Sequence, residues 1–428
     1  MNTPELKNLK SWIEIPDKSD FPVYNLPYGI GCFEDGSHSV VSRVGDHIIN
    51  LSLLFQSGLL RADELVLKHL ASEFLNDFIA LPRNVHKAVR TRLIELLTDK
   101  RAGLYDLDTE IKNNIIVPHR HVQLTLPVKP GDYTDFYSSK EHATNVGIMF
   151  RGKDNALMPN WLHMPIAYHG RASSIVVSGA AIHRPWGQIA PPEGGNPLFT
   201  PSKQLDFELE MAFVTRQGKP LGQPIRVDEA EEYIFGMVIF NDWSARDIQK
   251  WEYQPLGPFL GKNFGSTISP WIVTLDALEP FRCAGPKPEK ELLSYLQTTG
   301  NKTFDIHLEV TIIPNGGTPT TVCRSNFKYL YWNMSQQLAH HTVNGCNIQA
   351  GDLMASGTIS GPEADSYGSM LELSWKGTKP LKLADGSERV FLHDGDTVEM
   401  RAYCQNNDMY LGFGLCTSTV LPAIDYYN

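Results

Sequence analysis

Residues 205–213 read L-D-F-E-L-E-M-A-F. Apolar and acidic residues alternate along this segment, and a period of two predicts a β-strand whose successive side chains point to opposite faces. One face would be apolar, whereas the other would carry Asp206, Glu208 and Glu210. Neighbours on one face lie about 7 Å apart, so two carboxylates there would repel by about 2.4 kcal/mol at an effective dielectric constant of about 20.

Two interpretations of this acidic face remain open from the segment alone. Acidic side chains are mostly exposed in proteins, which favours a strand with one solvated face. If the face is buried instead, a cation must lie against it. A hard divalent ion is the natural candidate, because Ca²⁺ and Mg²⁺ prefer carboxylate oxygens.

Length and composition are those of an ordinary globular protein. The chain has 428 residues, enough for about two to three domains. Its 34 Gly and 28 Pro indicate many turns and favour a β-rich fold. The 38 basic and 48 acidic residues give a net charge of -10, and no basic run resembles a nucleic-acid-binding surface. We therefore expect no nucleic-acid partner.

The N-terminal segment, M-N-T-P-E-L-K-N-L-K, contains no apolar stretch of signal-peptide length. No run of about 18 apolar residues occurs in the sequence, which argues against a membrane-spanning helix. The six cysteines are scattered singly without a C-x-x-C pair, as is typical of reduced structural thiols. We expect a soluble, cytoplasmic protein with no membrane partner.

Turn residues and apolar patterns divide the chain into two predicted domains, 1–120 and 121–428. The first contains short strands followed by a helical hairpin, whose two apolar stripes lie at 67–78 and 85–97. A proline-bounded extended stretch then joins it to the second domain. The second domain is mostly strand patterns, with one helix predicted at 327–341.

Two polar runs are candidates for chemistry. The run 131–152 contains an aspartate, a tyrosine, a histidine and an arginine within 17 positions, namely Asp135, Tyr137, His142 and Arg151. Each has an ordinary structural alternative, such as a surface ion pair or a hydrogen-bonded histidine.

The second run, 236–270, begins with an apolar strand that breaks at Asn241-Asp242-Trp243. A strand end is a common position for a functional group, which makes Asp242 a candidate. A short helix is predicted from Ser244, with Arg246, Gln249 and Tyr253 on one face. The alternative is a solvated helical face.

Several long motifs resemble the fumarylacetoacetate hydrolase family. They include D-Y-T-D-F-Y-S-S, H-A-T-N-V-G-I-M-F-R-G-K, N-D-W-S-A-R-D-I-Q and S-M-L-E-L-S-W-K-G-T-K. The resemblance covers nearly the whole chain. It implies a mainly β protein with some α structure: a small SH3-like N-terminal barrel and a larger C-terminal mixed β-sandwich roll. It also implies a homodimer.

The resemblance implies a cation site as well. Its ligands would be four carboxylates: Asp135, Glu208, Glu210 and Asp242. Calcium is the first choice and magnesium the second, because Ca²⁺ tolerates crowded carboxylates better. A possible additional Mg²⁺ would lie near Asp242, Lys262 and Ser266, where this chain has Ser in place of the expected Thr. Asp206 has no matching role.

The implied reaction is hydrolysis of the carbon-carbon bond of 4-fumarylacetoacetate to fumarate and acetoacetate, the last step of tyrosine and phenylalanine degradation. The general base would be His142, oriented by Glu372. Donors that stabilise the oxyanion and the leaving carbanion would be Arg246, Gln249 and Lys262. Six residues would contact the substrate: Tyr137, Arg151, Tyr168, Gln249, Tyr253 and Thr358.

Two alternatives to this activity remain open. Another oxo-acid enzyme of the same superfamily, such as an acylpyruvase, decarboxylase or hydratase, would use a related cation site. The N-terminal region of about 120 residues and the pair of His142 and Glu372 argue against it. A calcium-stabilised β-rich binding protein without turnover is the alternative from a different class.

Overall fold

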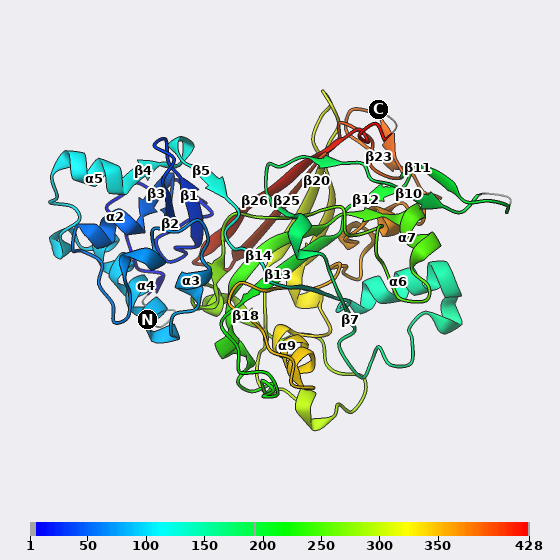
Figure 1. The fold of residues 1–428 in the computed structure, drawn as a ribbon, viewed down its shortest axis with the longest axis horizontal. Helices are drawn as coiled ribbons and strands as arrows, with labels where there is room; N and C mark the ends of the chain where they lie inside the picture. Colours follow the sequence, from blue (N-terminus) through cyan, green and yellow to red (C-terminus); the bar gives the residue numbers. More distant parts are fainter. Residues whose placement is uncertain (1–5, 192–193, 427–428) are drawn as a thin grey trace.

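The computed structural model describes residues 6–191 and 194–426. An N-terminal part, blue to cyan in Figure 1, lies beside a larger C-terminal part that contains most of the strands. The mainly β fold class predicted from the sequence is confirmed by this arrangement.

The N-terminal part is built on a five-stranded antiparallel sheet in the order β4-β3-β2-β1-β5. Its strands are β1 (Tyr28–Cys32), β2 (His38–Val44), β3 (His47–Asn50), β4 (Ile116–Pro118) and β5 (Gln123–Thr125). The described residues near this sheet include four α-helices of four residues or more: α2 (Leu51–Gln56), α3 (Asn76–Ile79), α4 (Arg83–Thr98) and α5 (Thr109–Ile115). The small β unit expected at this end of the chain is therefore present.

The predicted helical hairpin is only half correct. Helix α4 confirms the second stripe, and its buried residues include Val85, Val89 and Leu93. The first stripe was wrong as a continuous helix, because it forms a 3₁₀ turn at Leu67–His69 and the short α3. Tertiary hydrogen bonds take the backbone groups that a helix would need: the Val40 N–H donates to the Leu70 carbonyl, and the Leu75 N–H to the Pro127 carbonyl.

The C-terminal part contains an eight-stranded mixed sheet, in which β7-β6-β22-β13-β14-β16-β8 follow one another and β17 pairs with β14. Its strands are β6 (Tyr133–Phe136), β7 (Ala167–His169), β8 (Ile175–Val177), β13 (Leu209–Thr215), β14 (Ile234–Asp242), β16 (Ser266–Ile268), β17 (Val273–Thr274) and β22 (Leu353–Ala355). Strands β6 and β22 pair in parallel, as do β8 and β16.

A second, five-stranded sheet runs in the order β21-β20-β25-β26-β9. Its strands are β9 (Ile182–His183), β20 (His307–Ile313), β21 (Thr320–Asn326), β25 (Thr397–Gln405) and β26 (Tyr410–Leu421). Figure 1 shows the long β25 and β26 crossing behind β13 and β14. A core of buried side chains from both sheets, such as Met211, Ile239, Met400 and Phe413, joins the two sheets.

Within the described residues, five α-helices and four two-stranded ribbons complete the C-terminal part. The helices are α6 (Lys140–Arg151), α7 (Arg246–Glu252), α8 (Leu275–Leu278), α9 (Met334–Thr342) and α10 (Met370–Leu373). The ribbons pair β10 (Trp186–Ile189) with β11 (Leu198–Pro201), β12 (Leu205–Asp206) with β15 (Ser244–Ala245), β18 (Arg282–Cys283) with β19 (Thr303–Phe304), and β23 (Leu381–Lys382) with β24 (Glu388–Arg389).

Three predicted boundaries shift. The strand expected at 205–213 is interrupted at Phe207 and Glu208, so that it forms β12 and β13. The helix expected at 327–341 begins only at Met334, because Asn333 forms a capping box there. The helix expected from Ser244 begins at Arg246, because the two preceding residues form β15.

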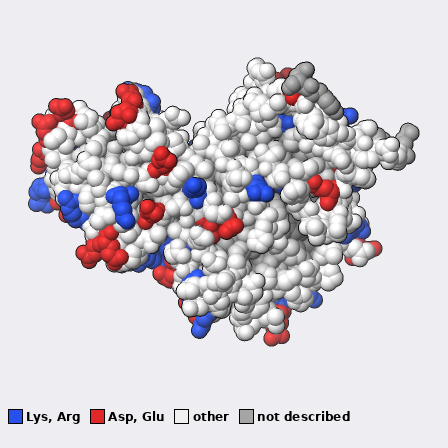
Figure 2. Space-filling view, in the orientation of Figure 1, with Lys and Arg blue, Asp and Glu red and all other residues white. Residues whose placement is uncertain are grey.

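The described surface carries mixed charge. On the face in Figure 2, Lys and Arg are scattered among Asp and Glu, and most of the area over the C-terminal part is uncharged. Among the described residues, no helix has both the length and the apolar character needed to cross a bilayer.

Candidate functional site

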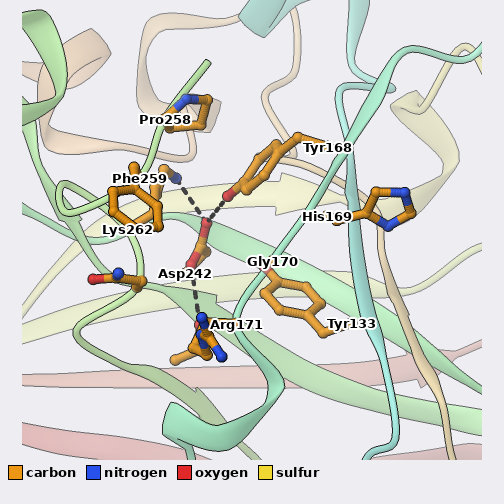
Figure 3. Close-up of a pocket in the computed structure, with 11 residues that line it drawn as sticks. Tyr133, Tyr168, His169, Gly170, Arg171, Asp242, Pro258, Phe259 and Lys262 are labelled. Carbon is orange, nitrogen blue, oxygen red and sulfur yellow. Dashed lines mark hydrogen bonds and ion pairs between the residues drawn. The ribbon is translucent and has the colours of Figure 1, made fainter. Parts of the chain in front are cut away.

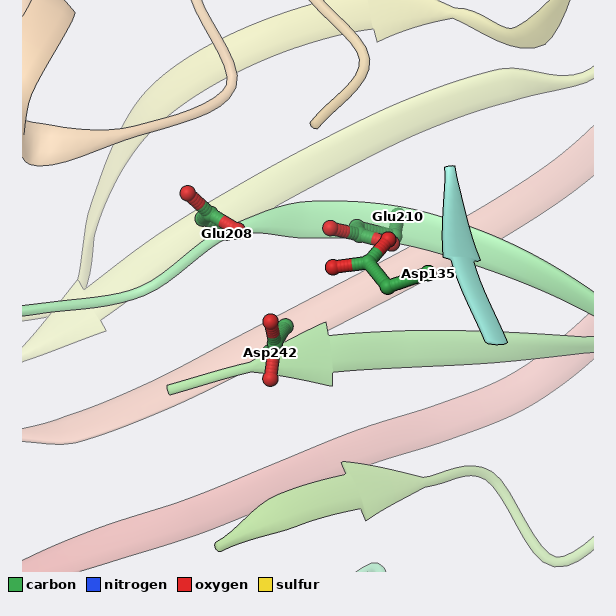
Figure 4. A group of neighbouring side chains, drawn as sticks. All are labelled: Asp135, Glu208, Glu210 and Asp242. Carbon is green, nitrogen blue, oxygen red and sulfur yellow. The ribbon is translucent and has the colours of Figure 1, made fainter. Parts of the chain in front are cut away.

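Four carboxylates converge where three strands and one strand break meet. Asp135 comes from β6, Glu210 from β13 and Asp242 from the end of β14, while Glu208 lies in the break before β13. One ligand oxygen from each residue lies within 4.8 Å of the others, and Figure 4 shows the side chains turned toward a common point. All four residues are buried. The solvated-face interpretation of 205–213 is therefore wrong.

Two oxygens of this cluster lack a protein partner. Asp135 Oδ1 and Glu210 Oε1 are buried and have no hydrogen bond to any described residue. Burial, reinforced by repulsion from Asp242, raises the pKa of Asp135. Burial together with the neighbouring Asp135 raises the pKa of Glu210 in the same way. The raised pKa values show that the ionised forms of Asp135 and Glu210 lack a compensating positive charge. A bound cation would supply that charge.

The backbone is shaped to the cluster at Gly357, which has a φ of +76°. Its N–H donates to Glu210 Oε2 at 3.0 Å. A Cβ at this position would lie 2.2 Å from the Phe136 carbonyl oxygen, so only glycine fits the close approach.

Two cationic side chains border the cluster on one side. Lys262 donates to Glu208 Oε2 and, at 2.8 Å, to Asp242 Oδ2. Arg246 Nη2 lies 2.8 Å from Glu208 Oε1. Burial alone would raise the pKa of Glu208, but Lys262 and Arg246 outweigh it and lower that pKa. Glu208 is therefore a carboxylate whose charge the protein itself compensates.

Asp242 is held by further hydrogen bonds. Tyr168 Oη donates to its Oδ2 at 2.9 Å, and Ser266 Oγ donates to its Oδ1 at 3.0 Å. A small cavity of about 100 Å³ adjoins this carboxylate (Figure 3), and Lys262 and Ser266 also line it. The three residues expected around a second Mg²⁺ thus lie together.

The four-carboxylate cluster fits a divalent ion by its donor set. All four ligands are oxygens from separate carboxylates, the arrangement that hard cations bind. The two unpartnered oxygens are the observation that decides the fit, because a buried carboxylate oxygen without a partner is costly. Asp135, Glu208, Glu210 and Asp242 are thus the residues that can hold the ion.

A larger cavity of about 500 Å³ opens beside the cluster. Eleven of the residues expected at the site line it: Asp135, Tyr137, His142, Arg151, Tyr168, Glu208, Arg246, Gln249, Tyr253, Lys262 and Thr358. The other four expected residues, Glu210, Asp242, Ser266 and Glu372, are not on its wall. Glu210 lies in the cluster with Asp135, Asp242 accepts from Lys262, and Glu372 pairs with His142. Ser266 donates to Asp242. The fold thus gathers residues that the sequence places up to 237 positions apart, from 135 to 372.

His142 and Glu372 form a buried pair at this cavity. His142 Nδ1 lies 2.6 Å from Glu372 Oε2, and the two residues are 4% and 1% exposed. The carboxylate is the acceptor, so Nδ1 carries the proton and Nε2 is the unprotonated nitrogen of the neutral ring. Burial would raise the pKa of Glu372, but His142 and the other hydrogen bonds lower it.

Three residues that the sequence did not single out hold Glu372. Asn145 Nδ2 donates to its Oε1 at 3.0 Å, and the hydroxyls of Ser360 and Ser369 lie 2.9 Å from its Oε2. Two of these three residues have sequence positions that could have indicated the contact. Asn145 is three residues after His142 on the same helix, and Ser369 precedes Glu372 with N-cap spacing. Ser360 gave no such signal.

Comparison with known proteins agrees with this geometry. A protein-family model described as the fumarylacetoacetate (FAA) hydrolase C-terminal domain matches residues 133–421, and one described as the fumarylacetoacetase N-terminal domain matches 24–127. The chain belongs to the fumarylacetoacetate hydrolase family. The resemblance read from the motifs is thereby confirmed.

Curated relatives in this family match the chain over almost its full length. The fumarylacetoacetase of Homo sapiens is 52% identical over 97% of this chain and 99% of its own length. The fumarylacetoacetases of Bos taurus and Dictyostelium discoideum are each 51% identical over 97% of this chain. These matches extend over 100% and 98% of the two relatives, respectively.

Solved structures show the same fold at much lower identity. A fumarylacetoacetate hydrolase from Exiguobacterium antarcticum superposes with a TM-score of 0.51 at 17% identity, covering 93% of this chain and 99% of that one. A putative HpcE protein from Mycobacterium smegmatis gives 0.52 at 19% identity, covering 92% and 99%. At these identities the likeness concerns the fold alone.

Proposed function

We propose that the protein hydrolyses the carbon-carbon bond of fumarylacetoacetate to give fumarate and acetoacetate, as the last step of tyrosine and phenylalanine degradation. The observation that carries this proposal is the pair of His142 and Glu372 on the same cavity as the four-carboxylate cluster. Relatives about half identical over nearly the whole chain bear the name of this activity.

Cleaving with water the bond between a carbonyl carbon and the carbon that links it to the second carbonyl group requires three things. A base must activate the water, donors must stabilise the oxyanion formed when hydroxide adds to one ketone, and the leaving carbon must receive a proton. The cavity supplies a residue for each of these tasks.

His142 is the base in this proposal. Its neutral imidazole presents Nε2 to the cavity, because Nδ1–H is bound to Glu372. Nε2 takes the proton of the attacking water, and the Glu372 carboxylate fixes the tautomer and stabilises the imidazolium. When the carbon-carbon bond breaks, its electron pair passes to the acetoacetate carbon. The imidazolium then returns a proton to that carbon.

Arg246, Gln249 and Lys262 are the proposed oxyanion donors. Arg246 Nη1 donates to Gln249 Oε1 at 3.1 Å, which leaves the NH₂ group as the donor side of that amide. The Lys262 ammonium lies at the same cavity. One such donor is typically worth about 3 kcal/mol of transition-state stabilisation.

Substrate contacts are proposed for six residues: Tyr137, Arg151, Tyr168, Gln249, Tyr253 and Thr358. Arg151 is exposed, and its guanidinium is already oriented by the carbonyls of Asn155 and Ala156 at 3.1 and 2.6 Å. A planar guanidinium suits a terminal carboxylate of the substrate.

Calcium is the proposed ion of the carboxylate cluster, with magnesium as the second choice, because four crowded carboxylates suit the larger and less rigid ion. When bound, the ion supplies Lewis acidity toward the oxygens of the diketone. An additional Mg²⁺ near Asp242, Lys262 and Ser266 is a further part of the proposal. We also propose a cytoplasmic homodimer whose subunit divides into residues 1–120 and 121–428.

The test is the loss of fumarylacetoacetate absorbance, with fumarate and acetoacetate identified as products, on adding the metal-loaded protein. Acylpyruvate or oxaloacetate turned over in place of fumarylacetoacetate would favour the related hydrolase, decarboxylase or hydratase activities. Folded, metal-loaded protein with no turnover of any of these would refute the enzyme.

Substitution of His142 tests whether this residue is the general base. His142→Ala should lower kcat by about 10²-fold or more while leaving the fold and Ca²⁺ affinity intact. The exposed His163, which does not line the cavity, provides the matched His→Ala control. Activity retained in His142→Ala would contradict the role of His142.

A further inference from the structure

Asp206 is fully buried, and its carboxylate is shared by two elements of the site. Its Oδ2 accepts from Arg246 Nε at 2.8 Å. Its Oδ1 accepts from the Met370 N–H at 2.6 Å, and its Oδ2 also accepts from the Leu371 N–H at 3.0 Å. The first partner begins α7, whereas the other two form the first turn of α10.

The two elements carry different functional groups. Helix α7 begins with Arg246, whose guanidinium borders the cavity. Helix α10 carries Glu372, which holds His142. Asp206 therefore contacts the side chain of a proposed oxyanion donor and the backbone beside the carboxylate that orients the proposed base.

Local backbone pairing brings Asp206 to this position. Strand β12 pairs with β15, so that Asp206 lies opposite Ser244, two residues before Arg246. The Arg246 N–H also donates to the Gln204 carbonyl at 2.9 Å. With Nε held by Asp206, the two terminal nitrogens of the guanidinium are left for Glu208 and Gln249.

We propose that Asp206 is a positioning residue that holds Arg246 and the first turn of α10 in one fixed register, so that the oxyanion donor and the His142–Glu372 pair keep their relative placement. The inference rests on the proposed function, because it assigns a part in that reaction. Asp206 touches neither the cavity nor the cation site, and it acts through the groups it holds.

Asp206→Asn is the appropriate perturbation. The amide keeps the shape of the side chain but has one acceptor oxygen. If that oxygen takes the Oδ2 position, the NH₂ group faces the Met370 N–H. If it takes the Oδ1 position, the NH₂ group faces both Arg246 Nε and the Leu371 N–H. The first orientation keeps Arg246 but loses one of the two hydrogen bonds to α10, whereas the second loses Arg246 and the other hydrogen bond to α10.

A matched control exists in the same chain. Asp396 is also buried, accepts from Arg389 Nε and Nη2 at 2.8 and 2.9 Å, and accepts from the His393 N–H at 2.8 Å. It therefore has the same local chemistry as Asp206, and none of these three residues lines the cavity. Asp396→Asn reports what loss of such a buried aspartate does to the fold alone.

We expect Asp206→Asn to lower kcat by about 10- to 100-fold with KM changed less than about 3-fold, because misplacing a transition-state donor affects the chemical step. Asp396→Asn should keep kcat at a comparable loss of thermal stability. Equal kcat losses in the two variants, or a loss confined to KM, would overturn the positioning role.

Chemical rescue gives a readout that a purely structural role would not affect. In Arg246→Ala, added methylguanidinium should restore part of kcat, because Asp206 and Glu208 still form its carboxylate anchor. In the double variant Arg246→Ala, Asp206→Asn, the same methylguanidinium should restore at least 10-fold less. Equal rescue in both variants would refute the inference.

Crystal structures of Asp206→Asn and Asp396→Asn separate this inference from the proposed function. Wild-type protein that fails to hydrolyse fumarylacetoacetate would refute the function. In that case the inference still stands or falls on whether Arg246 or α10 has moved in Asp206→Asn. Active wild-type enzyme together with an unmoved Arg246 and α10 in that variant would overturn the inference alone.

Discussion

Replacing Glu372 with Gln tests the proposed base most directly. The substitution keeps the shape of a side chain that is 1% exposed and accepts from four donors: His142, Asn145, Ser360 and Ser369. It removes the negative charge beside Nδ1 of His142. If the amide NH₂ turns toward that nitrogen, the ring must also adopt the other tautomer, which places a proton on Nε2.

The expected loss follows from the geometry. The atoms His142 Nδ1 and Glu372 Oε2 lie 2.6 Å apart, so that the centres of the imidazolium and carboxylate charges are about 4 Å apart. At an effective dielectric constant of about 20, their attraction is about 4 kcal/mol. The imidazolium exists only after proton transfer, so this attraction is made in the transition state and not in the ground state. Its loss corresponds to a decrease of about 10³-fold in kcat.

The assay is the steady-state disappearance of fumarylacetoacetate, with Ca²⁺ affinity measured by calorimetry on the same preparations. Glu372→Gln should keep the Ca²⁺ affinity, because Glu372 is not among the four clustered carboxylates. Glu141→Gln, one residue before His142 on α6, is the matched control and should change kcat by less than about 3-fold. A Glu372→Gln variant within 10-fold of wild-type kcat would refute the reasoning.

Three further predictions concern the substrate, the cation and the fold. Arg151→Ala should raise KM by about 10-fold or more with little change in kcat, because a charged hydrogen bond to substrate is worth about 1.5–3 kcal/mol; an unchanged KM would exclude the contact. Chelated protein should gain about 2.7 kcal/mol of unfolding free energy when free Ca²⁺ is about 100 times its Kd, which thermal unfolding would detect; a melting temperature indifferent to Ca²⁺ would count against the site. Burial, with Arg216 adding to it, lowers the pKa of His86 to about 3. Because the unfolded chain takes up this proton first, the stability is full above about pH 6.5 and falls by about 2 kcal/mol from pH 7 to pH 5. Urea unfolding should show a smaller fall in His86→Asn, and an equal fall would disprove the assignment.

The structure brings the residues expected at the site to one cavity and the cluster beside it, whereas several helix and strand boundaries expected around them shift. Glu208, Glu210 and Asp242 could be recognised as candidates from the sequence. The alternation of apolar and acidic residues marks the first two, and the end of a predicted strand marks Asp242. The helix expected at 67–78 failed, because the Leu70 carbonyl and the Leu75 N–H bind distant segments. Such hydrogen bonds depend on tertiary packing, which propensity does not contain.

The burial of the acidic face was also beyond local reasoning. Glu210 is buried because β13 is central in its sheet, between β22 and β14, and β22 lies 138 residues or more further along the chain. Once the face is buried, the physical argument from the opening segment applies, and a cation becomes necessary. The segment alone indicates only that a buried acidic face needs a cation, and the position of β13 in its sheet is what buries that face.

The interruption of the strand at Phe207 and Glu208 gives the three acids of that segment different tasks. A continuous strand would have directed Asp206, Glu208 and Glu210 to one face, where three buried carboxylates would compete for the same positive charge. Instead, β12 pairs with β15 and presents Asp206 to Arg246, whereas Glu208 forms an isolated bridge with Ser369 and turns toward the cluster. The three partners of Asp206 lie 40, 164 and 165 positions away, so no local pattern could assign its role. The strand break therefore separates Asp206, which contacts Arg246 and α10 outside the cluster, from Glu208 and Glu210, which lie in the cluster that can bind a cation.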